Sequence, residues 1–533
     1  MQNPNIFPDT INHSINIAKT WLLNRKSKSS WEFPVINSSY IATALSIYVL
    51  TGEKKVSATH YLLENKVWEK CLIAAEIFGI ALQETGEEFL AKEVFINCQN
   101  EIKKKGTDKR IIFKEQLKNV KLTYSFNLSE NEISLIPLYG IFFKLSPEKI
   151  WYDRTSFFYQ FFHETALLLL SKKDAKINKK IINVMKKALN SDGSYGGLTV
   201  CTIRAAYILK QLNEEELASK SIEWIEKTIS EDGGLRPILW QDVYDTAWCS
   251  LALANSGENI DDIICWLNKT HIGDGYPYVS NSYFPDPDDT PLVLLAKIIS
   301  NNLDTTDYKT VDFLIKCQKS NGGWTWSPFL EGIVKKKLLT IVGILFNSIC
   351  IFICRYRKGY GFLSRAYSHQ SFRPSIDITS RVLITLSYFK GRKNAAKAIK
   401  KGLNFLLNNY SNGRFRASRL YTSSHIYETS MALIALYKND IKNEATEEAL
   451  SWLLEQDLES AEDAAHILWA LIEGNYDRTR SDKLIDFIIS KQLPDGSWEF
   501  KVGFLANLQY YYSLFSIAAP LYALTLYRNK YRD

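Results

Sequence analysis

Several features are scarce in this chain, and each scarcity argues against a class of protein. The eight cysteines are scattered, with no C-x-x-C pair and no histidine at metal-ligand spacing, so no structural metal site is predicted. No stripe of lysine and arginine is interleaved with aromatic residues, which argues against binding to nucleic acid. Segments of alternating polarity are nearly absent, so few strands are expected. No basic stretch followed by an apolar one begins the chain, so no secretory signal is expected.

Apolar and aromatic residues are abundant instead. Of the 533 residues, 46% are hydrophobic and 13% are aromatic, which allows two or three domains with sizeable cores. The formal net charge of +7 is mild for this length. Because the cysteines are scattered thiols, we expect a reducing compartment and a cytoplasmic protein.

One segment departs from this soluble pattern. Residues 338–354 form an apolar run of 17 residues with basic residues on both sides, within the wider segment 335–358. Seventeen residues lie at the lower limit for a helix that spans a bilayer, whereas basic flanks suit an element that dips into one leaflet. The run therefore predicts peripheral, monotopic membrane association, and a buried core helix is the alternative.

A recurring turn is the clearest sign of internal organisation. An aromatic-aliphatic stretch precedes a glycine-containing turn, often with another aromatic residue after it, and copies start at Trp224, Trp266, Phe313, Phe405 and Phe487. The first three starts are 42 and 47 residues apart. Helices rich in small and aliphatic residues lie between the turns. Two helices per repeat of this length predict an all-α fold in which inner and outer helices close into α-α barrels.

Three carboxylates crowd a short segment before one of the apolar helices. Asp286, Asp288 and Asp289 repel one another when ionised, so one carboxyl is expected to stay protonated near neutral pH. A neutral carboxyl whose ionised form is stabilised by its neighbours is a strong Brønsted acid. A surface turn, or a cap for the helix that follows, is the alternative interpretation of the same residues.

The turns and the acidic segment together resemble a known family. Gln318 with Gly-Gly-Trp at 322–324, and Gln492 with Gly-Ser-Trp at 496–498, look like the QW repeats of the squalene-hopene cyclase superfamily, the class II terpene cyclases. Residues 283–290 resemble the D-x-D-D-T segment by which that family protonates its substrate. Residues 242–247 and 374–379 resemble two further family segments, so the resemblance runs from about residue 185 to the C-terminus.

The resemblance implies two α-α barrels, with one inserted into the other. It makes residues 1–19 an N-terminal helix that joins the catalytic barrel, 20–258 a second, shortened barrel, and 259–533 the catalytic barrel with 335–358 as an apolar insertion. The first 180 residues match the family poorly.

The resemblance also implies roles for individual residues. Asp288 is the implied proton donor, and Asp286 and Asp289 support its acidity. Family positions that line the substrate cavity are occupied by Tyr276, Tyr278, His425, Tyr427, Tyr512 and Phe515. His425 is a candidate for the base that ends the reaction or for a hydrogen-bond partner of the acid. No metal or cofactor is expected, because no D-D-x-x-D motif is present, unless the substrate is a diphosphate that brings magnesium.

The expected function is therefore the protonation-initiated cyclisation of a linear isoprenoid. The segments at 242–247 and 374–379 and the apolar run favour a squalene-like polyene drawn from the membrane, whereas chain length favours a prenyl diphosphate that keeps its head group. Protein prenyltransferase β subunits share the barrel but need a zinc site, which is not apparent, and a non-catalytic binding scaffold is a further alternative. The expected partners are the apolar substrate and a membrane surface, and a homodimer stays open.

Overall fold

The computed structural model describes most of the chain, and its helices account for nearly all regular structure there. The described residues are 6–31, 38–70, 72–104, 175–236, 241–282, 285–325, 374–415, 425–476, 478–499, 502–505, 508–511 and 514–531. Within them the strands are confined to two short hairpins, β1(Tyr410–Ser411) with β2(Arg414–Phe415) and β3(Val502–Leu505) with β4(Leu508–Tyr511). The all-α prediction is confirmed. The apolar run at 338–354 lies outside the described residues.

Six helices form a closed inner ring. They are α15(Asp242–Ser256), α17(Thr290–Ile299), α20(Ile376–Leu386), α22(His425–Lys438), α24(Ala461–Glu473) and α26(Phe515–Lys530). Each packs on the next in this order, and α26 packs on α15 to close the ring. All eleven residues of α20 are buried, as expected of a helix surrounded by other helices.

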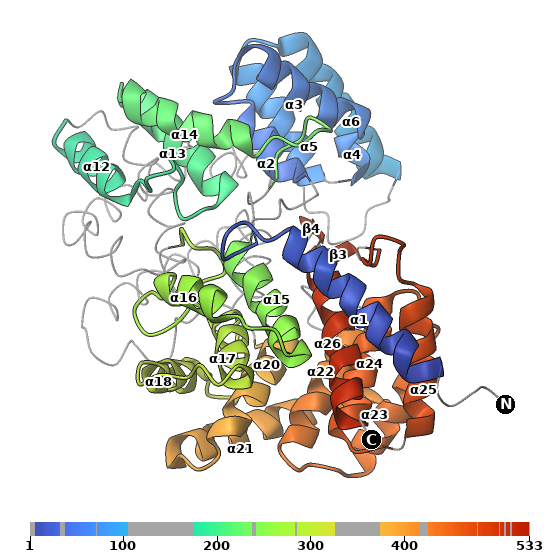
Figure 1. Ribbon diagram of the computed structural model, residues 1–533. Coiled ribbons are helices and arrows are strands. Elements are labelled where there is room, and N and C mark those ends of the chain that lie inside the picture. Colours follow the sequence, from blue (N-terminus) through green and yellow to red (C-terminus); the bar gives the residue numbers. More distant parts are fainter. Residues whose placement is uncertain are drawn as a thin grey trace.

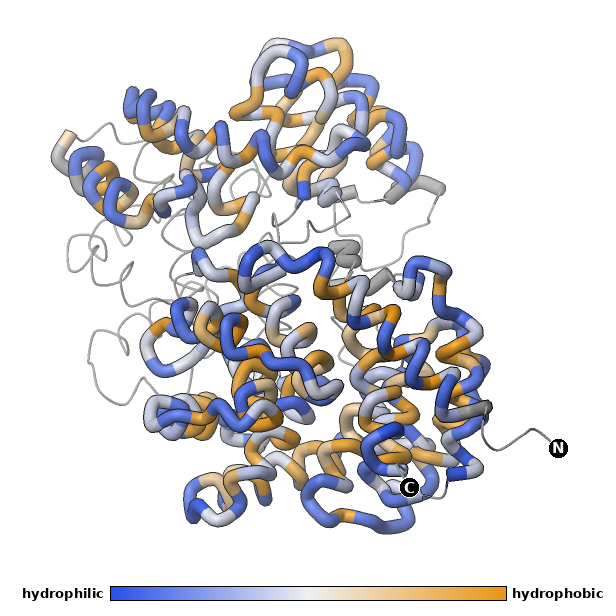
Figure 2. Tube along the Cα trace, viewed as in Figure 1, coloured by the Kyte–Doolittle hydropathy of each residue, from blue (hydrophilic) through white to orange (hydrophobic). Residues whose placement is uncertain are grey.

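A second layer of helices covers the ring from outside. It consists of α1(Ile6–Asn24), α16(Asp261–Lys269), α18(Asp307–Cys317), α21(Lys393–Asn408), α23(Glu444–Leu454) and α25(Arg478–Ser490). These helices have one apolar face: α21 buries Ala395, Ala398, Ile399, Gly402, Leu403, Phe405 and Leu406, at helical spacing. Along the helices at the edge of the molecule, hydrophilic and hydrophobic residues alternate (Figure 2).

The N-terminal helix belongs to this barrel. Helix α1 packs on α26 and α15, and it lies beside the C-terminal helices in Figure 1. The amide of Trp31, just after α1, donates to the Thr246 hydroxyl of α15 (3.1 Å). The chain therefore leaves the barrel after α1 and returns to it at α15.

The remaining described helices form a second unit with its own core. They are α2(Tyr40–Ser46), α3(Gly52–Glu64), α4(Val67–Lys70), α5(Leu72–Glu84), α6(Glu88–Lys104), α12(Ala175–Ala188), α13(Thr199–Gln211) and α14(Glu215–Lys227). Its apolar cluster ends at Leu235, and the cluster of the six-helix ring resumes at Val243. The two cores thus divide before α15, whereas the sequence placed the boundary after it, near residue 258.

The same contact joins turn and inner helix in both units. In six copies the residue that ends a turn donates its amide hydrogen to a threonine near the start of a helix. The pairs are Trp31–Thr246, Tyr276–Thr290, Trp324–Thr379, Phe415–Thr429, Tyr195–Thr202 and Leu235–Thr43. The predicted repeat is therefore a structural repeat.

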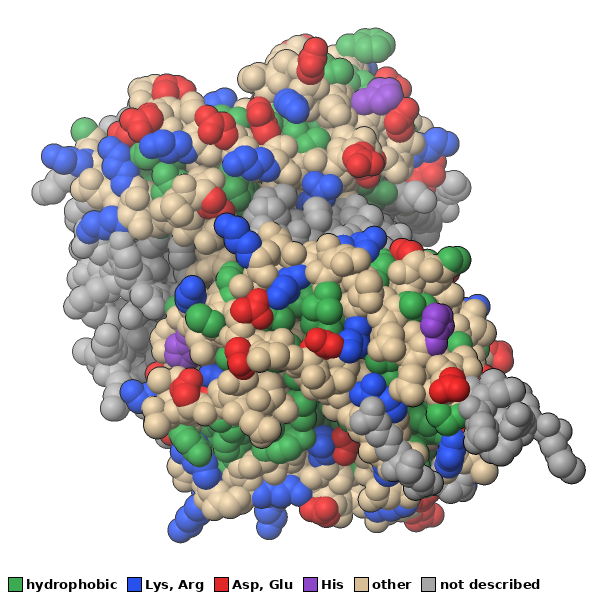
Figure 3. All heavy atoms as spheres, viewed as in Figure 1, with side chains coloured by type: hydrophobic (Ala, Val, Ile, Leu, Met, Phe, Trp, Pro, Cys, Tyr) green, Lys and Arg blue, Asp and Glu red, His purple; other side chains and the backbone are tan. Residues whose placement is uncertain are grey.

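No helix in the described ranges is both long enough and apolar enough to cross a membrane. On the face shown in Figure 3, basic and acidic side chains are interspersed rather than gathered into patches of one sign.

Candidate active site

The acidic segment lies in the loop that leads into α17, and hydrogen bonds fix it at both ends. The Tyr276 amide donates to the Thr290 hydroxyl (2.9 Å), and that hydroxyl donates to the Tyr276 carbonyl (3.0 Å). The Asp286 amide also donates to the Tyr276 carbonyl (3.0 Å). On the other side, a carboxylate oxygen of Asp242 on α15 accepts the Ser280 amide (2.9 Å). The loop is thus held between α15 and α17.

Within this loop Asp286 has a structural task. Its Oδ1 accepts the amides of Asp288 (2.9 Å) and Asp289 (2.8 Å), which turns the chain into the first turn of α17. The side chain is buried, at 2% exposure. Asp286 therefore holds the turn that precedes α17, and the N-cap residue Asp289 makes no capping hydrogen bond with its side chain.

Asp288 faces a different environment. Its side chain is 21% exposed, against 2% and 3% for the Asp286 and Asp289 residues, and it forms an ion pair with Arg381 of α20. Arg381 also pairs with Asp377 one turn earlier (3.2 Å) and donates from Nη1 to the Tyr427 hydroxyl on α22 (2.8 Å). Three inner helices therefore meet at the guanidinium group.

All three carboxyl groups have raised pKa values, and burial is the largest cause for each. The pKa of Asp286 is raised to about 7, and the nearby charge of Asp288 adds to the effect of burial. Burial raises the pKa of Asp288 to about 6, and the Arg381 charge acts against this rise. The pKa of Asp289 lies well above its usual range, since the charges of both neighbouring carboxylates add to burial.

The three carboxyls therefore differ in what they can do. Asp288 combines the greatest exposure with a cation that stabilises its ionised form, so it is the best suited to give up a proton. Asp289 favours its neutral form, and Asp286 is occupied with two backbone amides.

A cluster of rings continues from Arg381 around the inner ring. Tyr427 packs edge-on against His466 of α24 (centroids 4.8 Å apart), and His466 lies 5.3 Å from Phe515, the first residue of α26. Phe515 in turn packs on Trp248 of α15 (4.6 Å), with Tyr244 beside both. Five of the six inner helices thus contribute a side chain to this cluster or to Arg381, and Asp288 comes from the loop just before the sixth, α17.

The structure separates the predicted cavity residues into two groups. Tyr427 and Phe515 lie in the ring cluster next to Arg381. Tyr278 donates from its hydroxyl to the Gly196 carbonyl of the second unit (3.0 Å). His425 is the exposed first residue of α22, where burial and the Arg414 charge lower its pKa. Tyr512 lies outside the described residues.

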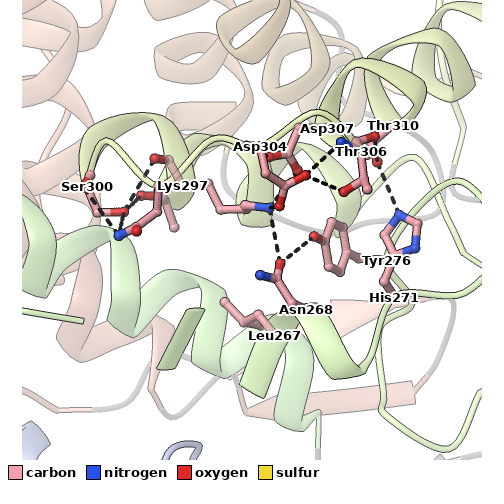
Figure 4. Close-up of polar contacts among 12 residues, drawn as sticks. Leu267, Asn268, His271, Tyr276, Lys297, Ser300, Asp304, Thr306, Asp307 and Thr310 are labelled. Atoms are coloured by element: carbon pink, nitrogen blue, oxygen red, sulfur yellow. Dashed lines mark hydrogen bonds and ion pairs between the residues drawn. The ribbon is translucent and has the colours of Figure 1, made fainter. Parts of the chain in front are cut away.

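Tyr276 points away from the acid. Its hydroxyl donates to Asn268 of α16 (3.1 Å), and its ring packs on His271 (4.9 Å). Asn268 also accepts from Lys297, a fully buried cation of α17 that pairs with Asp307 (2.7 Å) and Asp304 (3.0 Å), as Figure 4 shows. This network braces α17 from the outside, so Tyr276 supports the site rather than lining it.

The sequence interpretation missed Arg381 and His466. A signal for Arg381 was present, because Asp377 and Arg381 are four residues apart in an otherwise uncharged helix and so share one face. A signal for His466 was weaker, since a lone histidine in an apolar helix is often a core residue. In the described part of the chain, no three histidine, cysteine or acidic residues are grouped so that they could hold a metal ion.

Comparisons with known proteins agree with this architecture. A family model described as the prenyltransferase alpha-alpha toroid domain matches residues 140–333 and 378–530. These ranges include the acidic segment and the residues Arg381, Tyr427, His466 and Phe515. No curated protein matches the chain.

Similar solved structures include three cyclases or synthases of terpenes. The type II terpene cyclase MstE from Scytonema is 16% identical over 55% of this chain and 90% of its own, with a TM-score of 0.41. Abietadiene synthase from Abies grandis is 13% identical over 98% of this chain and 58% of its own, with a TM-score of 0.49. The ent-copalyl diphosphate synthase from Arabidopsis thaliana is 12% identical over 90% of this chain and 74% of its own, with a TM-score of 0.39.

Proposed function

Because the chain belongs to the prenyltransferase alpha-alpha toroid family, we propose that it is a class II terpene cyclase, which cyclises a linear isoprenoid after protonating it. The observation that carries the proposal is Asp288: a partly exposed carboxyl with a raised pKa, paired with a buried arginine and followed by a cluster of aromatic rings. A surface turn would need neither the buried cation nor the rings.

In the first step, Asp288 transfers its proton to a terminal alkene carbon of the substrate. The O–H bond breaks, the π electrons of the alkene form the new C–H bond, and the positive charge stays on the more substituted carbon. The Asp288 carboxylate that remains is stabilised by Arg381, whose other nitrogen is held by Tyr427. Asp377 holds the guanidinium in place.

In the following steps the rings of the cluster stabilise the moving charge. Tyr427, Phe515, Trp248 and Tyr244 supply aromatic rings from three inner helices, and the π faces of such rings attract a cation. Each well-placed face contributes about 1–2 kcal/mol to a desolvated cation. The rings also exclude water, which would otherwise quench the cation early.

We propose a squalene-like polyene as the substrate, with a prenyl diphosphate that keeps its diphosphate as the alternative. The apolar run at 338–354, by its sequence, supports peripheral attachment to a membrane from which such a polyene is drawn. The chemistry of Asp288 requires no metal. Magnesium is expected to matter only if the substrate is a diphosphate.

The proposal is tested with purified protein and three candidate substrates: squalene, farnesyl diphosphate and geranylgeranyl diphosphate. Products are identified by mass spectrometry before and after phosphatase treatment, because a product seen only after dephosphorylation identifies a diphosphate substrate. Each reaction is repeated with a metal chelator.

The Asp288→Asn variant separates a cyclase from a binding scaffold. Loss of the proton donor should lower product formation by about 10³-fold or more, with an unchanged circular dichroism spectrum. Asp274→Asn is the matched control, because Asp274 is an exposed carboxylate in the same loop. Full activity of Asp288→Asn, or binding of all three substrates by the parent protein without conversion, would contradict the proposal.

A further inference from the structure

His466 occupies an unusual position among the histidines of the described residues. It lies on an inner helix, is 1% exposed, and packs against the rings of both Tyr427 and Phe515, which also contact each other. His425, a candidate from the sequence for the base or for a hydrogen-bond partner of the acid, is exposed at the start of α22. His13 and His60 are exposed on α1 and α3, and His271 lies outside the inner ring, beside Thr310 of α18.

A hydrogen bond fixes the tautomer of His466. Its Nδ1 lies 2.7 Å from the backbone carbonyl of Glu462, one turn earlier in α24. A carbonyl oxygen can only accept, so Nδ1 must carry the hydrogen. In the neutral ring, Nε2 then holds the lone pair and is the basic nitrogen. The helix itself therefore presents His466 as a proton acceptor.

His466 and Asp288 stand on opposite walls of the inner ring. Going round the ring, α17 is followed by α20, α22 and then α24, so three steps separate the acid from the histidine in either direction. Arg381 and Tyr427 connect the two along one side. A chain that is protonated at one wall and folds across the ring brings its last cationic carbon towards the other wall.

We propose that His466 is the base that ends the reaction, an inference that rests on the proposed cyclase function. Nε2 takes a proton from a carbon next to the final cationic carbon; that C–H bond breaks, and its electron pair forms the product's double bond. The imidazolium that results lies beside the rings of Tyr427 and Phe515 (centroids 4.8 and 5.3 Å away), and the face of a ring turned towards it stabilises its charge. After product release the imidazolium gives its proton to water, and water returns one to the Asp288 carboxylate, so no net charge is gained.

The test compares the products of His466→Phe with those of the parent protein, using squalene and geranylgeranyl diphosphate as probes. Phenylalanine keeps a ring that can pack against Tyr427 and Phe515 but removes Nε2. We expect continued consumption of the probe, a drop of at least about tenfold in the share of the parent olefin, and a matching rise in alcohols or alkene isomers. His60→Phe is the matched control, because His60 is an exposed histidine of the second unit, and its products should equal those of the parent.

The outcomes separate this inference from the proposed function. A parent protein that converts neither probe, nor farnesyl diphosphate, counts against the proposed function. If the parent protein is active and the His466→Phe variant gives the same products at the same rate, His466 is not the base. His466→Gln serves as a second variant if the phenylalanine variant does not fold.

A spectroscopic measurement adds a test that needs no turnover. In nitrogen-15 spectra of histidine-labelled protein, the signal of His466 is the one that is absent from a folded His466 variant. That signal should have the chemical shifts of the Nδ1–H tautomer. The Nε2–H tautomer at that position would overturn the inference whether or not the probes react.

Discussion

At the scale of single residues, Arg381 has two opposite effects on catalysis. Its charge lowers the pKa of Asp288, which reduces the protonated fraction at neutral pH but makes the protonated form a stronger acid. Burial acts in the other direction and is the larger effect, leaving the pKa of Asp288 at about 6. Because the reaction needs the protonated form, its rate should be highest below about pH 6 and fall as the pH rises through that value.

Replacing Arg381 by glutamine should therefore change the pH profile as well as the rate. Without the cation the pKa of Asp288 rises, so the fall in rate should move to higher pH by about one unit or more. The maximal rate should drop by about 10²-fold, because the carboxylate left by proton transfer loses its partner. The measurement is product formation between pH 5 and 9.

Arg381→Lys is the conservative variant for this prediction. It keeps the positive charge but loses the second nitrogen that reaches Tyr427, so its pH profile should stay close to that of the parent. A purely structural role for Arg381 predicts a lower rate with an unmoved pH profile in both variants. A shift of the glutamine profile to lower pH would contradict the electrostatic argument.

The same scale shows what the sequence could and could not predict about the site. The crowding of Asp286, Asp288 and Asp289 is local, so their mutual repulsion could be predicted from spacing, whereas burial, the largest cause of their raised pKa values, could not. The partner of Asp288 is 93 residues away, and it becomes visible only when α17 and α20 are neighbours in the ring. The sequence could not decide whether His425 or His466 is the better candidate for the base, because the burial of each side chain depends on where its helix begins.

At the scale of elements, the glycine turns work by close approach to the next outer helix. A Cβ atom at Gly322 would lie 2.3 Å from the Lys401 carbonyl oxygen of α21, and one at Gly193 would lie 2.3 Å from that of Lys220 on α14. At Gly496 the neighbour is the Ile17 carbonyl of α1, at 2.6 Å. The glycine and its spacing were predicted from sequence, whereas the helix on which each turn rests was not.

Gly322→Ala is expected to destabilise the barrel strongly. The backbone at Gly322 has φ +94°, and an added methyl group would collide with a backbone carbonyl that cannot move without α21. The free energy of unfolding should fall by about 3 kcal/mol or more, measured by urea denaturation.

Gly257→Ala is the matched control for this change. Gly257 has the same φ of +94°, but no heavy atom lies within 4 Å of its added Cβ atom, so only the conformational cost of about 1–2 kcal/mol applies. Equal losses in the two variants would show that the turn does not depend on its contact with α21.

At the scale of the whole molecule, the barrel is built from two distant parts of the chain. Helix α1 is the outer partner of α26, although the second unit separates α1 from the rest of the barrel in sequence. The Ser14 hydroxyl donates to the Gln492 side chain (2.6 Å), and the Trp21 ring nitrogen donates to Asp495 (2.9 Å). The resemblance implied such an N-terminal helix. The boundary between the second unit and the barrel, which lies before α15, could be located only from the two apolar cores of the folded structure.

This split assembly predicts that a change near residue 15 destabilises helices almost 500 residues later. Ile15 is fully buried on α1, so Ile15→Asp places an unpaired charge in the core and should lower the free energy of unfolding by about 3–5 kcal/mol. Hydrogen exchange should accelerate in the turn at 492–498 and in α26. Asn16→Asp adds the same charge to the exposed face of α1, and its exchange pattern should match the parent. If Ile15→Asp accelerates exchange in α1 alone, the helix is an appendage and the barrel folds without it.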